Sequence, residues 1–486
     1  MNNKELLNIL KKENLPETKI KNNSDQKLSQ NLLIDADLMK LISDSVDNNI
    51  WQLLEEIIQE AELKAWSLYV VGGIVRDLFL LKKNQKILIQ DIDLVVDSNT
   101  SPSNIGAGIE LAQTLKKRYP EVLLTVYHDF KTASLSWNKD KKYGSVQIDI
   151  TTSRTETYLY PAANPKIQIA PIEQDLFRRD FTINALAVKL TSPAQGKLLD
   201  LFMGLSDLRK AQIKVLHPNS FLEDPIRIYR AVKFAIRLDF DIEAQTIQYI
   251  YNATKNQTYD HLKLEVNIIP SLTIRLKNEL RSILQSNSWR KSLELLSCFG
   301  ALYYLYPGLI LNCEILRQMR YVSRLMKYSD PHHKTIKWLL LLEILLSSIP
   351  LKERKIIAIN LQLPSESIKR LSEIQNINKE INQGLRKYSK ISDKVNLLNK
   401  FYWIDLILVA AQSKKEIRYF IWRYFTKLSK ISSPLNGSDL KNIGYLPGPR
   451  YKEALTILLD KTLDGEIKTK QEAKIMVQTI MELSLI

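Results

Sequence analysis

Two aspartates separated by a single residue are the strongest chemical signal in the sequence. Asp91 and Asp93 begin the segment DIDLVV, whose apolar residues predict a β-strand. Alternate side chains of a strand point to the same face, so both carboxylates should lie side by side on a rigid surface. Paired carboxylates suit Mg²⁺, which takes oxygen ligands and binds beside substrate phosphates. The spacing therefore predicts a metal site, with an ordinary strand edge as the simpler alternative.

The segment LYVVGGIVRD, upstream of these aspartates, adds the features of a phosphate site. Residues 68–71 predict a strand, and Gly72 and Gly73 lead into a short helical stretch that carries Arg76 and Asp77. Glycine lets the backbone approach a ligand closely, and the N-terminus of a helix favours an anion. The stretch therefore predicts a phosphate cradle next to the metal clamp.

Two further clusters could complete such a site. Asp149, in the predicted strand VQIDIT, could add a third carboxylate, and three carboxylates that hold two metals suit in-line nucleotidyl transfer. In DLFRRDFTINALAV, Arg178 and Arg179 could hold triphosphate oxygens, because guanidinium groups match phosphate geometry. Asp180 could orient one of these arginines or contact a ribose hydroxyl. A solvated charge cluster is the simpler alternative for the basic pair.

A third cluster, FLEDPIRIYRAVKFAIRLDF, could read a nucleobase. Pro225 suits the first position of a helix, which makes Asp224 its expected N-cap and places Glu223, Arg227 and Arg230 on one helical face. When a carboxylate lies beside a guanidinium, the carboxylate accepts from an exocyclic amine and the guanidinium donates to a ring nitrogen, and cytosine and adenine present both of these groups. Uracil and guanine would leave these groups mispaired. The alternative is a surface ion pair that only caps the helix.

The apolar pattern that must position these residues changes near residue 201. Before it, strands and helices alternate, with strands expected at 68–71, 87–96, 122–127, 132–137, 145–151 and 185–190 and helices at 74–81, 106–119 and 172–177. Helical spacing also precedes the first strand, and the polar segment before Gly144 predicts a hairpin turn. After residue 201, apolar residues recur at helical spacing to residue 486. One of these segments, WLLLLEILL, is too short to span a membrane. The fold class is therefore α+β, with a mostly antiparallel sheet followed by an all-α half.

Composition limits the partners and the compartment. The 486 residues include 69 Lys and Arg against 53 Asp and Glu, a net charge of +16. Such an excess favours a polyanionic partner, nucleic acid first, whereas a membrane-surface role would need a more basic amphipathic segment. Cys298 and Cys313 are the only cysteines and are expected to be reduced core residues of a cytoplasmic protein, and no secretory signal is predicted.

In this order, the segments resemble the class II tRNA nucleotidyltransferases, which comprise CCA-, CC- and A-adding enzymes together with bacterial poly(A) polymerases. The likeness rests on GGIVRD with DID, DITTSRTETYLYPAANP, RRDFTINALAV, LLDLFMGLSDL, EDPIRIYRAVKFAIRLDF, RLKNELRSIL and NGSDLKNIGYLPGPRYKEALTILLDKTLDGEI. It implies a mobile extension (1–45), a nucleotidyltransferase palm or head (46–200), a neck with the templating helix (201–275), a helical body (276–370) and a tRNA-binding tail (371–486).

The resemblance also implies roles for individual residues. It implies catalytic Asp91, Asp93 and Asp149, the first two as metal ligands, and nucleotide contacts by Gly72, Gly73, Arg76, Asp77, Arg178, Arg179, Asp180, Asn184, Glu223, Asp224, Arg227, Arg230 and Lys233. The family usually has arginine in place of Lys233, which keeps the charge but loses bidentate geometry. In the tail, KKEIRYFIWRYFTKLSK could contact RNA, or it could be an amphipathic helix with Tyr419, Trp422 and Phe425 in the core.

The implied function is Mg²⁺-dependent addition of C and/or A to the 3′ end of tRNA from CTP and ATP, with release of pyrophosphate. Addition of A only, addition of CC only and poly(A) tailing are the alternatives within the family, and a catalytically inactive RNA-binding protein is the alternative from another class. A mobile loop in the 139–165 region is the expected switch between C and A. The sequence leaves the oligomeric state open.

Overall fold

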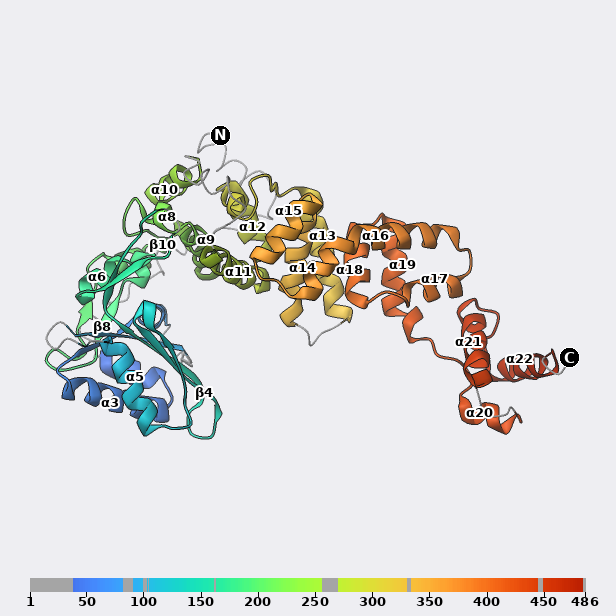
Figure 1. Ribbon diagram of the computed structural model, residues 1–486, viewed down its shortest axis with the longest axis horizontal. Coiled ribbons are helices and arrows are strands. Elements are labelled where there is room, and N and C mark those ends of the chain that lie inside the picture. Colours follow the sequence, from blue (N-terminus) through green and yellow to red (C-terminus); the bar gives the residue numbers. More distant parts are fainter. Residues whose placement is uncertain are drawn as a thin grey trace, which may run out of the picture. The chain divides into compact units, whose positions relative to one another are not determined.

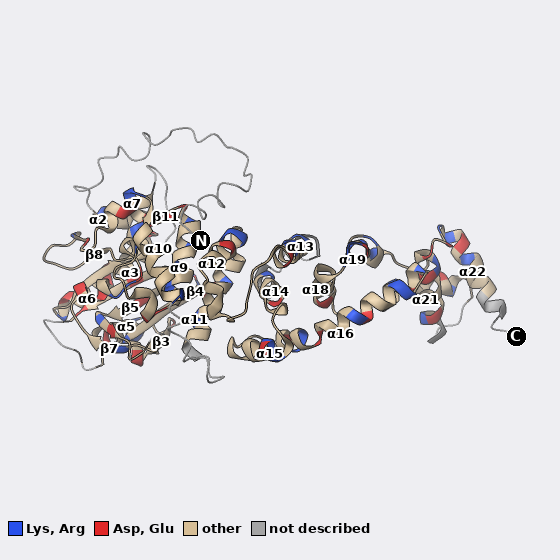
Figure 2. Cartoon of the chain, turned by 90° about the horizontal axis from the view of Figure 1, so that it is seen from above, with Lys and Arg blue, Asp and Glu red and all other residues tan. Residues whose placement is uncertain are grey.

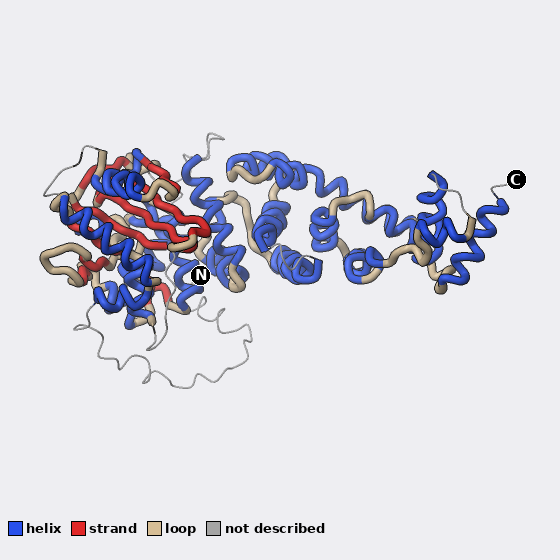
Figure 3. The backbone as a smooth tube through the Cα atoms, turned by 90° about the horizontal axis from the view of Figure 1, so that it is seen from below, coloured by secondary structure: helices blue, strands red, loops and turns tan. Residues whose placement is uncertain are grey.

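The computed structural model of the protein describes residues 38–81, 91–98, 103, 105–160, 163–255, 270–329, 334–444 and 449–483. The chain divides into two compact units. The first takes in the chain to Thr157, Pro165–His217 and Asp241–Glu243, and the second takes in Tyr158–Asn164, Pro218–Phe240 and the chain from Ala244. All strands of the described residues, red in Figure 3, lie in the first unit, and the second unit is helical.

The first unit is built around one mixed sheet. Its elements are α2 (Leu38–Ser45), α3 (Asn48–Leu63), β1 (Ser67–Val71), α4 (Gly73–Leu80), β2 (Asp91–Asp97), α5 (Ala107–Arg118), β3 (Leu123–Tyr127), η1 (His128–Phe130), β4 (Thr132–Asp140), β5 (Gly144–Thr152), β6 (Arg154–Thr157), β7 (Lys166–Ile169), α6 (Ile172–Phe177), η2 (Thr182–Asn184), β8 (Ala187–Lys189), β9 (Leu198–Leu199), α7 (Gly204–Arg209), β10 (Gln212–Ile213) and β11 (Asp241–Ile242). The expected helices and strands of this half are therefore present, although residues 87–90 lie outside the described part.

The main sheet has the strand order β3-β4-β5-β2-β1-β8-β9. Every neighbouring pair is antiparallel except β2 and β5, which run parallel, so the expectation of a mostly antiparallel sheet is confirmed. Helix α5 packs on β2, β3, β4 and β5, and α3 packs on β1 and α5 (Figure 1). The parallel pair at the centre is the contact that brings β2 beside β5.

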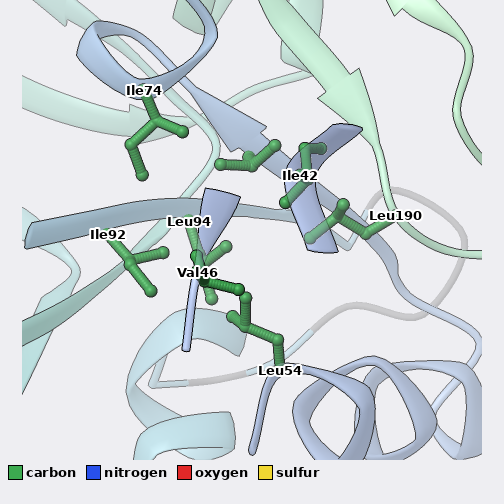
Figure 4. Close-up of a pocket in the computed structure, with 8 residues that line it drawn as sticks. Ile42, Val46, Leu54, Ile74, Ile92, Leu94 and Leu190 are labelled. Carbon is green, nitrogen blue, oxygen red and sulfur yellow. The ribbon is translucent and has the colours of Figure 1, made fainter. Parts of the chain in front are cut away.

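An apolar cavity lies under the start of β2, between the sheet and the preceding helices (Figure 4). It is lined only by aliphatic side chains: Ile42, Val46, Leu54, Val70, Ile74, Ile92, Leu94 and Leu190. With no polar group to hold a water molecule or a ligand, it is a packing gap and not a binding site. Its lining shows that α2 belongs to the core of this unit, although the extension was expected to reach residue 45; residues 1–37 lie outside the described part.

The second unit consists of helices. They are α8 (Ser220–Glu223), α9 (Ile226–Leu238), α10 (Ala244–Lys255), α11 (Pro270–Gln285), α12 (Trp289–Cys298), η4 (Ala301–Tyr304), α13 (Cys313–Ser329), α14 (Lys334–Ser347), α15 (Leu351–Asn360), α16 (Ser365–Lys387), α17 (Ile391–Leu398), α18 (Trp403–Gln412), α19 (Lys415–Thr426), η5 (Leu428–Lys430), α20 (Gly437–Asn442), α21 (Pro449–Leu463) and α22 (Lys470–Leu483). The expected all-α half is therefore confirmed. The five-part division of the chain stays a prediction.

Helix α14 contains the segment WLLLLEILL and is a buried core helix, as predicted. Glu343 is 1% exposed within it, and its carboxylate accepts hydrogen bonds from Arg370 Nε and Nη2 (3.0 and 2.8 Å) and from Ser367 Oγ (2.6 Å). A buried carboxylate is tolerated when it is paired in this way. Across the described residues, no helix is long and apolar enough to cross a membrane.

Three expectations about smaller features are wrong. Cys298 and Cys313 are free thiols at helix ends, and both are exposed and not in the core. The described residues of the 139–165 region, which was expected to be a loop, are mostly strand, because the apolar alternation continues through β5 into β6. The mobility expected of this region stays a prediction. In α19 the buried residues are Ile417 and Ile421, whereas the Tyr419 side chain is exposed.

Candidate functional site

The paired aspartates lie at the start of β2, where the alternation of the strand exposes them. Asp91 and Asp93 are exposed, and Ile92 between them is buried at 2% exposure. The parallel register of β2 and β5 places Asp93 opposite Asp149 and Asp91 opposite Gln147. The structure thus brings the third predicted carboxylate beside the pair, and Gln147 Nε2 donates to Asp149 Oδ1 at 3.0 Å.

The donor set at this strand end fits a hard divalent cation. Asp91 and Asp93 offer exposed carboxylate oxygens on one face, which are the ligands that Mg²⁺ takes together with substrate phosphates. Among the described residues, no three His, Cys, Asp or Glu side chains gather closely enough to hold a metal by themselves. Mg²⁺ commonly uses only one or two carboxylates, so the pair fits, and a metal-binding part for Asp149 stays a prediction.

The backbone at Gly72 comes close to Asp93. Its φ of +72° is in the left-handed region that favours glycine, and it precedes α4. A Cβ added here would lie 3.1 Å from Arg179 Nη1 and 3.9 Å from Asp93 Oδ2. The loop therefore has an arginine and a carboxylate on the same side, as a phosphate cradle beside a metal site requires.

Four of the predicted nucleotide contacts form one hydrogen-bonded chain behind this loop. The Arg76 side chain is buried, with Nε donating to Asp77 Oδ1 at 2.7 Å and Nη1 donating to Asn184 Oδ1 at 2.6 Å. Asn184 Nδ2 in turn donates to Asp180 Oδ1 at 2.9 Å. Arg76 Nη2 would lie 3.5 Å from a Cβ placed on Gly73. Arg76 therefore ties the glycine loop to the η2 segment and fixes its shape.

Arg178 and Arg179 separate into two different roles around a buried carboxylate. Arg178 uses all three of its nitrogens, because Nε and Nη2 donate to Asp175 Oδ1 (3.0 and 2.6 Å) and Nη1 donates to Glu156 Oε1 (2.8 Å). Arg179 donates from Nη2 to Asp175 Oδ2 at 3.0 Å, and its buried Nε has no hydrogen-bond partner. Only Arg179 also reaches Gly72. Arg178 is therefore an internal brace, and Arg179 is the arginine at the cradle.

Asp175 holds both arginines and was missed as a functional residue. It is fully buried within α6, and burial alone would raise its pKa. The charges of Arg178 and Arg179 outweigh that effect and lower the pKa of Asp175 below its usual range. The sequence feature that could have identified Asp175 is its position three and four residues before the two arginines, at the end of a predicted helix, where such spacings bring side chains together. Arg154 lies beside Arg178, and burial, which disfavours its charged form, lowers its pKa to about 10.

In the second unit, the predicted base-reading residues lie around a break between α8 and α9. The expected single face through Glu223, Arg227 and Arg230 is wrong, because Glu223 ends α8 and Asp224 has extended backbone at φ −138°. Helix α9 begins at Ile226, whose N–H donates to Asp224 Oδ1 at 3.1 Å. The expected capping contact of Asp224 is therefore present, although the helix begins at Ile226 and not at Pro225.

Asp224 and Arg227 are both held by other residues of this unit. Arg275 Nη1 on α11 donates to Asp224 Oδ2 at 2.7 Å, and Arg227 Nη1 donates to Ser220 Oγ at 2.5 Å. Asp224 and Arg227 are 9% and 5% exposed, so the expected alternative of a surface ion pair does not apply. Arg275 had no assigned role, although it lies in RLKNELRSIL, one of the segments that carry the family resemblance.

Arg230 and Lys233 turn toward α11. Arg230 Nη1 lies 3.5 Å from Glu279 Oε1, and Lys233 Nζ lies 2.5 Å from Glu279 Oε2. The ammonium group of Lys233 is thus paired in the place where the family usually has arginine. These contacts join α9 to α11 and so stabilise the break that carries Asp224.

Comparison with known proteins finds similarity to one kind of enzyme. Residues 68–214 match the poly A polymerase head domain. The A-adding tRNA nucleotidyltransferase of Geobacter sulfurreducens is 30% identical over 83% of this chain and 44% of its own length. The solved structure of the Thermotoga maritima CCA-adding enzyme complexed with tRNA has a TM-score of 0.67 at 27% identity, over 92% of this chain and 98% of that one. The chain is therefore similar, in sequence and in structure, to tRNA nucleotidyltransferases and to the head domain of poly A polymerases.

Other similar proteins match different shares of this chain. The A-adding enzyme of Halalkalibacterium halodurans is 26% identical over 90% of this chain and 94% of its own length. A CCA-adding enzyme of Lactobacillus delbrueckii is 34% identical over 40% of this chain and 43% of its own. The chain spans less than half the length of the Geobacter relative, so similarity to that protein concerns only the shared part.

Proposed function

We propose that the protein adds nucleotides to the 3′ end of tRNA from ATP and/or CTP and releases pyrophosphate. The observation that carries the proposal is the convergence of Gly72, Arg179 and Asp93 at one end of the sheet. A flexible backbone, a guanidinium and a carboxylate at that point suit a nucleoside triphosphate with its cation. The family relationship supplies the class of acceptor.

The side chains of the first unit have defined parts in this reaction. The 3′ hydroxyl of the RNA attacks the α-phosphorus, a new phosphodiester bond forms, and the bond to the β-phosphate oxygen breaks. Arg179 and the backbone at Gly72 hold phosphate oxygens, while Arg76 keeps the loop in shape through Asn184. Asp91 and Asp93 would hold Mg²⁺, which lowers the pKa of the attacking hydroxyl and neutralises charge on the leaving pyrophosphate.

The base-reading part of the proposal rests on Asp224 and Arg227. Each oxygen of Asp224 has one protein donor, Ile226 N–H on Oδ1 and Arg275 on Oδ2. A carboxylate oxygen accepts more than one hydrogen bond, so Asp224 can also accept from the exocyclic amine of adenine or cytosine. Arg275 holds the carboxylate in position, and Arg227 can donate to the neighbouring ring nitrogen. Uracil and guanine would leave the same groups mispaired.

Addition of A is the narrower activity that we favour. The relatives named as A-adding match 83% and 90% of this chain, whereas the Lactobacillus CCA-adding relative matches only 40%. Adding C and A in sequence is the second candidate, because the structurally similar enzymes include CCA-adding enzymes in complex with CTP and with ATP.

The test uses the purified full chain, Mg²⁺ and three forms of one tRNA, which end before CCA, after the first C and after CC. Each is incubated with CTP, with ATP or with both. We expect ATP to add one A to the tRNA that ends in CC and neither nucleotide to extend the other two. Extension of all three would establish CCA addition. Binding of tRNA without any incorporation would overturn the enzymatic proposal and leave an inactive RNA-binding protein.

A further inference from the structure

Helix α19 displays aromatic side chains on its outer face. Its buried side is formed by Ile417 and Ile421, at 5% and 0% exposure, whereas Tyr419 is 62% exposed. The Tyr419 ring stacks on the Trp422 ring, with centroids 5.9 Å apart and planes inclined by 26°. A stacked pair of rings at the surface is a feature that helix packing does not require, because the core contacts of α19 are made elsewhere.

Basic side chains border this pair along the same helix. Lys415 and Arg423 lie four residues before and after Tyr419, so all three share one row on the helix surface. Neither cation has a carboxylate partner among the described residues. Figure 2 shows basic residues on α19. The row therefore alternates positive charge with an exposed aromatic ring.

The helix that carries the pair is fixed in place by a different arginine. Arg418 donates from Nη2 to the carbonyl of Ser413 at 2.9 Å and from Nε to that of Ala410 at 3.3 Å. Its guanidinium also lies 5.2 Å from the centre of the Tyr321 ring on α13, and the Tyr321 hydroxyl donates to the Arg418 carbonyl. These contacts hold α19 against α13, so the aromatic pair is presented on a rigid support.

We propose that Tyr419 and Trp422, with Lys415 and Arg423, bind the RNA substrate by stacking on an unpaired or helix-terminal base. Aromatic rings stack on any base, and the flanking cations can contact the adjoining phosphates. The net charge of +16 favours a polyanion over an acidic peptide or an apolar partner. The inference rests on the proposed function, which makes RNA the substrate, and adds a contact in the helical unit.

A second tyrosine in this unit provides a matched control. Tyr402 is 58% exposed and lies next to Trp403, but their rings are tilted by 53° and the acidic residue Asp405 follows. It therefore has the exposure of Tyr419 without the stacked geometry or the row of cations. A general effect of removing a surface tyrosine should appear in both variants, whereas loss of a stacking surface should appear only at Tyr419.

The experiment measures the Kd of the full chain for a fluorescent tRNA that ends in CC, at several salt concentrations. We expect Tyr419→Ala to weaken binding by about 5- to 150-fold, with Tyr419→Phe close to the unchanged protein, because one stacked base accounts for such a factor. The slope of log Kd against log salt should stay the same in Tyr419→Ala and fall by about one in Lys415→Gln. Tyr402→Ala should bind as the unchanged protein does.

The outcomes separate this inference from the proposed function. If the unchanged protein adds nucleotides and Tyr419→Ala binds tRNA as tightly, the stacking surface is wrong and the enzyme stands. If tRNA binding depends on Tyr419 but no nucleotide is ever added, the proposed function fails and the RNA contact stands. Binding to phosphatidylserine vesicles that is lost in Tyr419→Ala, without any change in the Kd for tRNA, would assign the pair to a lipid surface and overturn the inference.

Discussion

Exchanging each of the two neighbouring arginines for glutamine tests the division of roles between them. Arg178 donates three hydrogen bonds to Asp175 and Glu156, and Asp175 is fully buried. Removing one partner of a buried ion pair typically costs about 3–5 kcal/mol, so Arg178→Gln should be strongly destabilising. Arg179→Gln removes one hydrogen bond and leaves Asp175 paired with Arg178, so it should cost only about 1–2 kcal/mol.

The effects on nucleotide use should have the opposite order. A charge-assisted hydrogen bond to a phosphate contributes about 1.5–3 kcal/mol, which corresponds to a roughly 10- to 150-fold fall in kcat/KM for ATP in Arg179→Gln. Urea unfolding at 25 °C gives the stabilities, and single-nucleotide addition to tRNA gives kcat/KM. Arg178→Gln should keep near-normal kcat/KM per folded molecule. A large kcat/KM loss in Arg178→Gln at unchanged stability, with normal Arg179→Gln, would refute the assignment.

Three further predictions concern the same unit. Asp91→Asn or Asp93→Asn should abolish nucleotide addition while the Kd for tRNA changes little, because these exposed carboxylates are expected to hold the cation; activity equal to that of the unchanged protein would contradict the metal assignment. Gly72→Ala and Gly144→Ala both place alanine at positive φ, which should lower the free energy of unfolding by about 1–2 kcal/mol. Only Gly72→Ala should also raise the KM for ATP, because its methyl group would meet Arg179, whereas the space at Gly144 is open. The pKa of Asp175 is lowered in the folded state, so its ionised form contributes stability above its unfolded pKa of 3.8 and loses that contribution as the pH falls through the folded value. The stability difference between the unchanged protein and Asp175→Asn should therefore shrink below pH 3.8, as measured by urea midpoints. A constant difference would count against the buried ion pair.

The sequence by itself determined the features that depend on neighbouring residues in the chain. The alternation of β2 exposes Asp91 and Asp93 and buries Ile92, because successive side chains of a strand point to opposite faces. The contact between Asp224 and the Ile226 N–H follows from the short span between them. The change from strands to helices near residue 201 is also local, since each type of element has its own apolar period.

Only the tertiary structure decided which charged side chains are paired inside the fold and which are exposed. Asp149 comes beside Asp93 because β5 pairs in parallel with β2, a contact between segments more than 50 residues apart. Arg178 and Arg179 are indistinguishable in sequence, but the burial of Asp175 between them directs only Arg179 toward Gly72. Arg275 reaches Asp224 across 51 residues, and packing of Ile417 and Ile421 turns Tyr419 outward. Residue types and spacing specify what chemistry is available, and long-range packing specifies which groups can take part in it, because packing sets how many donors and acceptors of each side chain are left for a ligand.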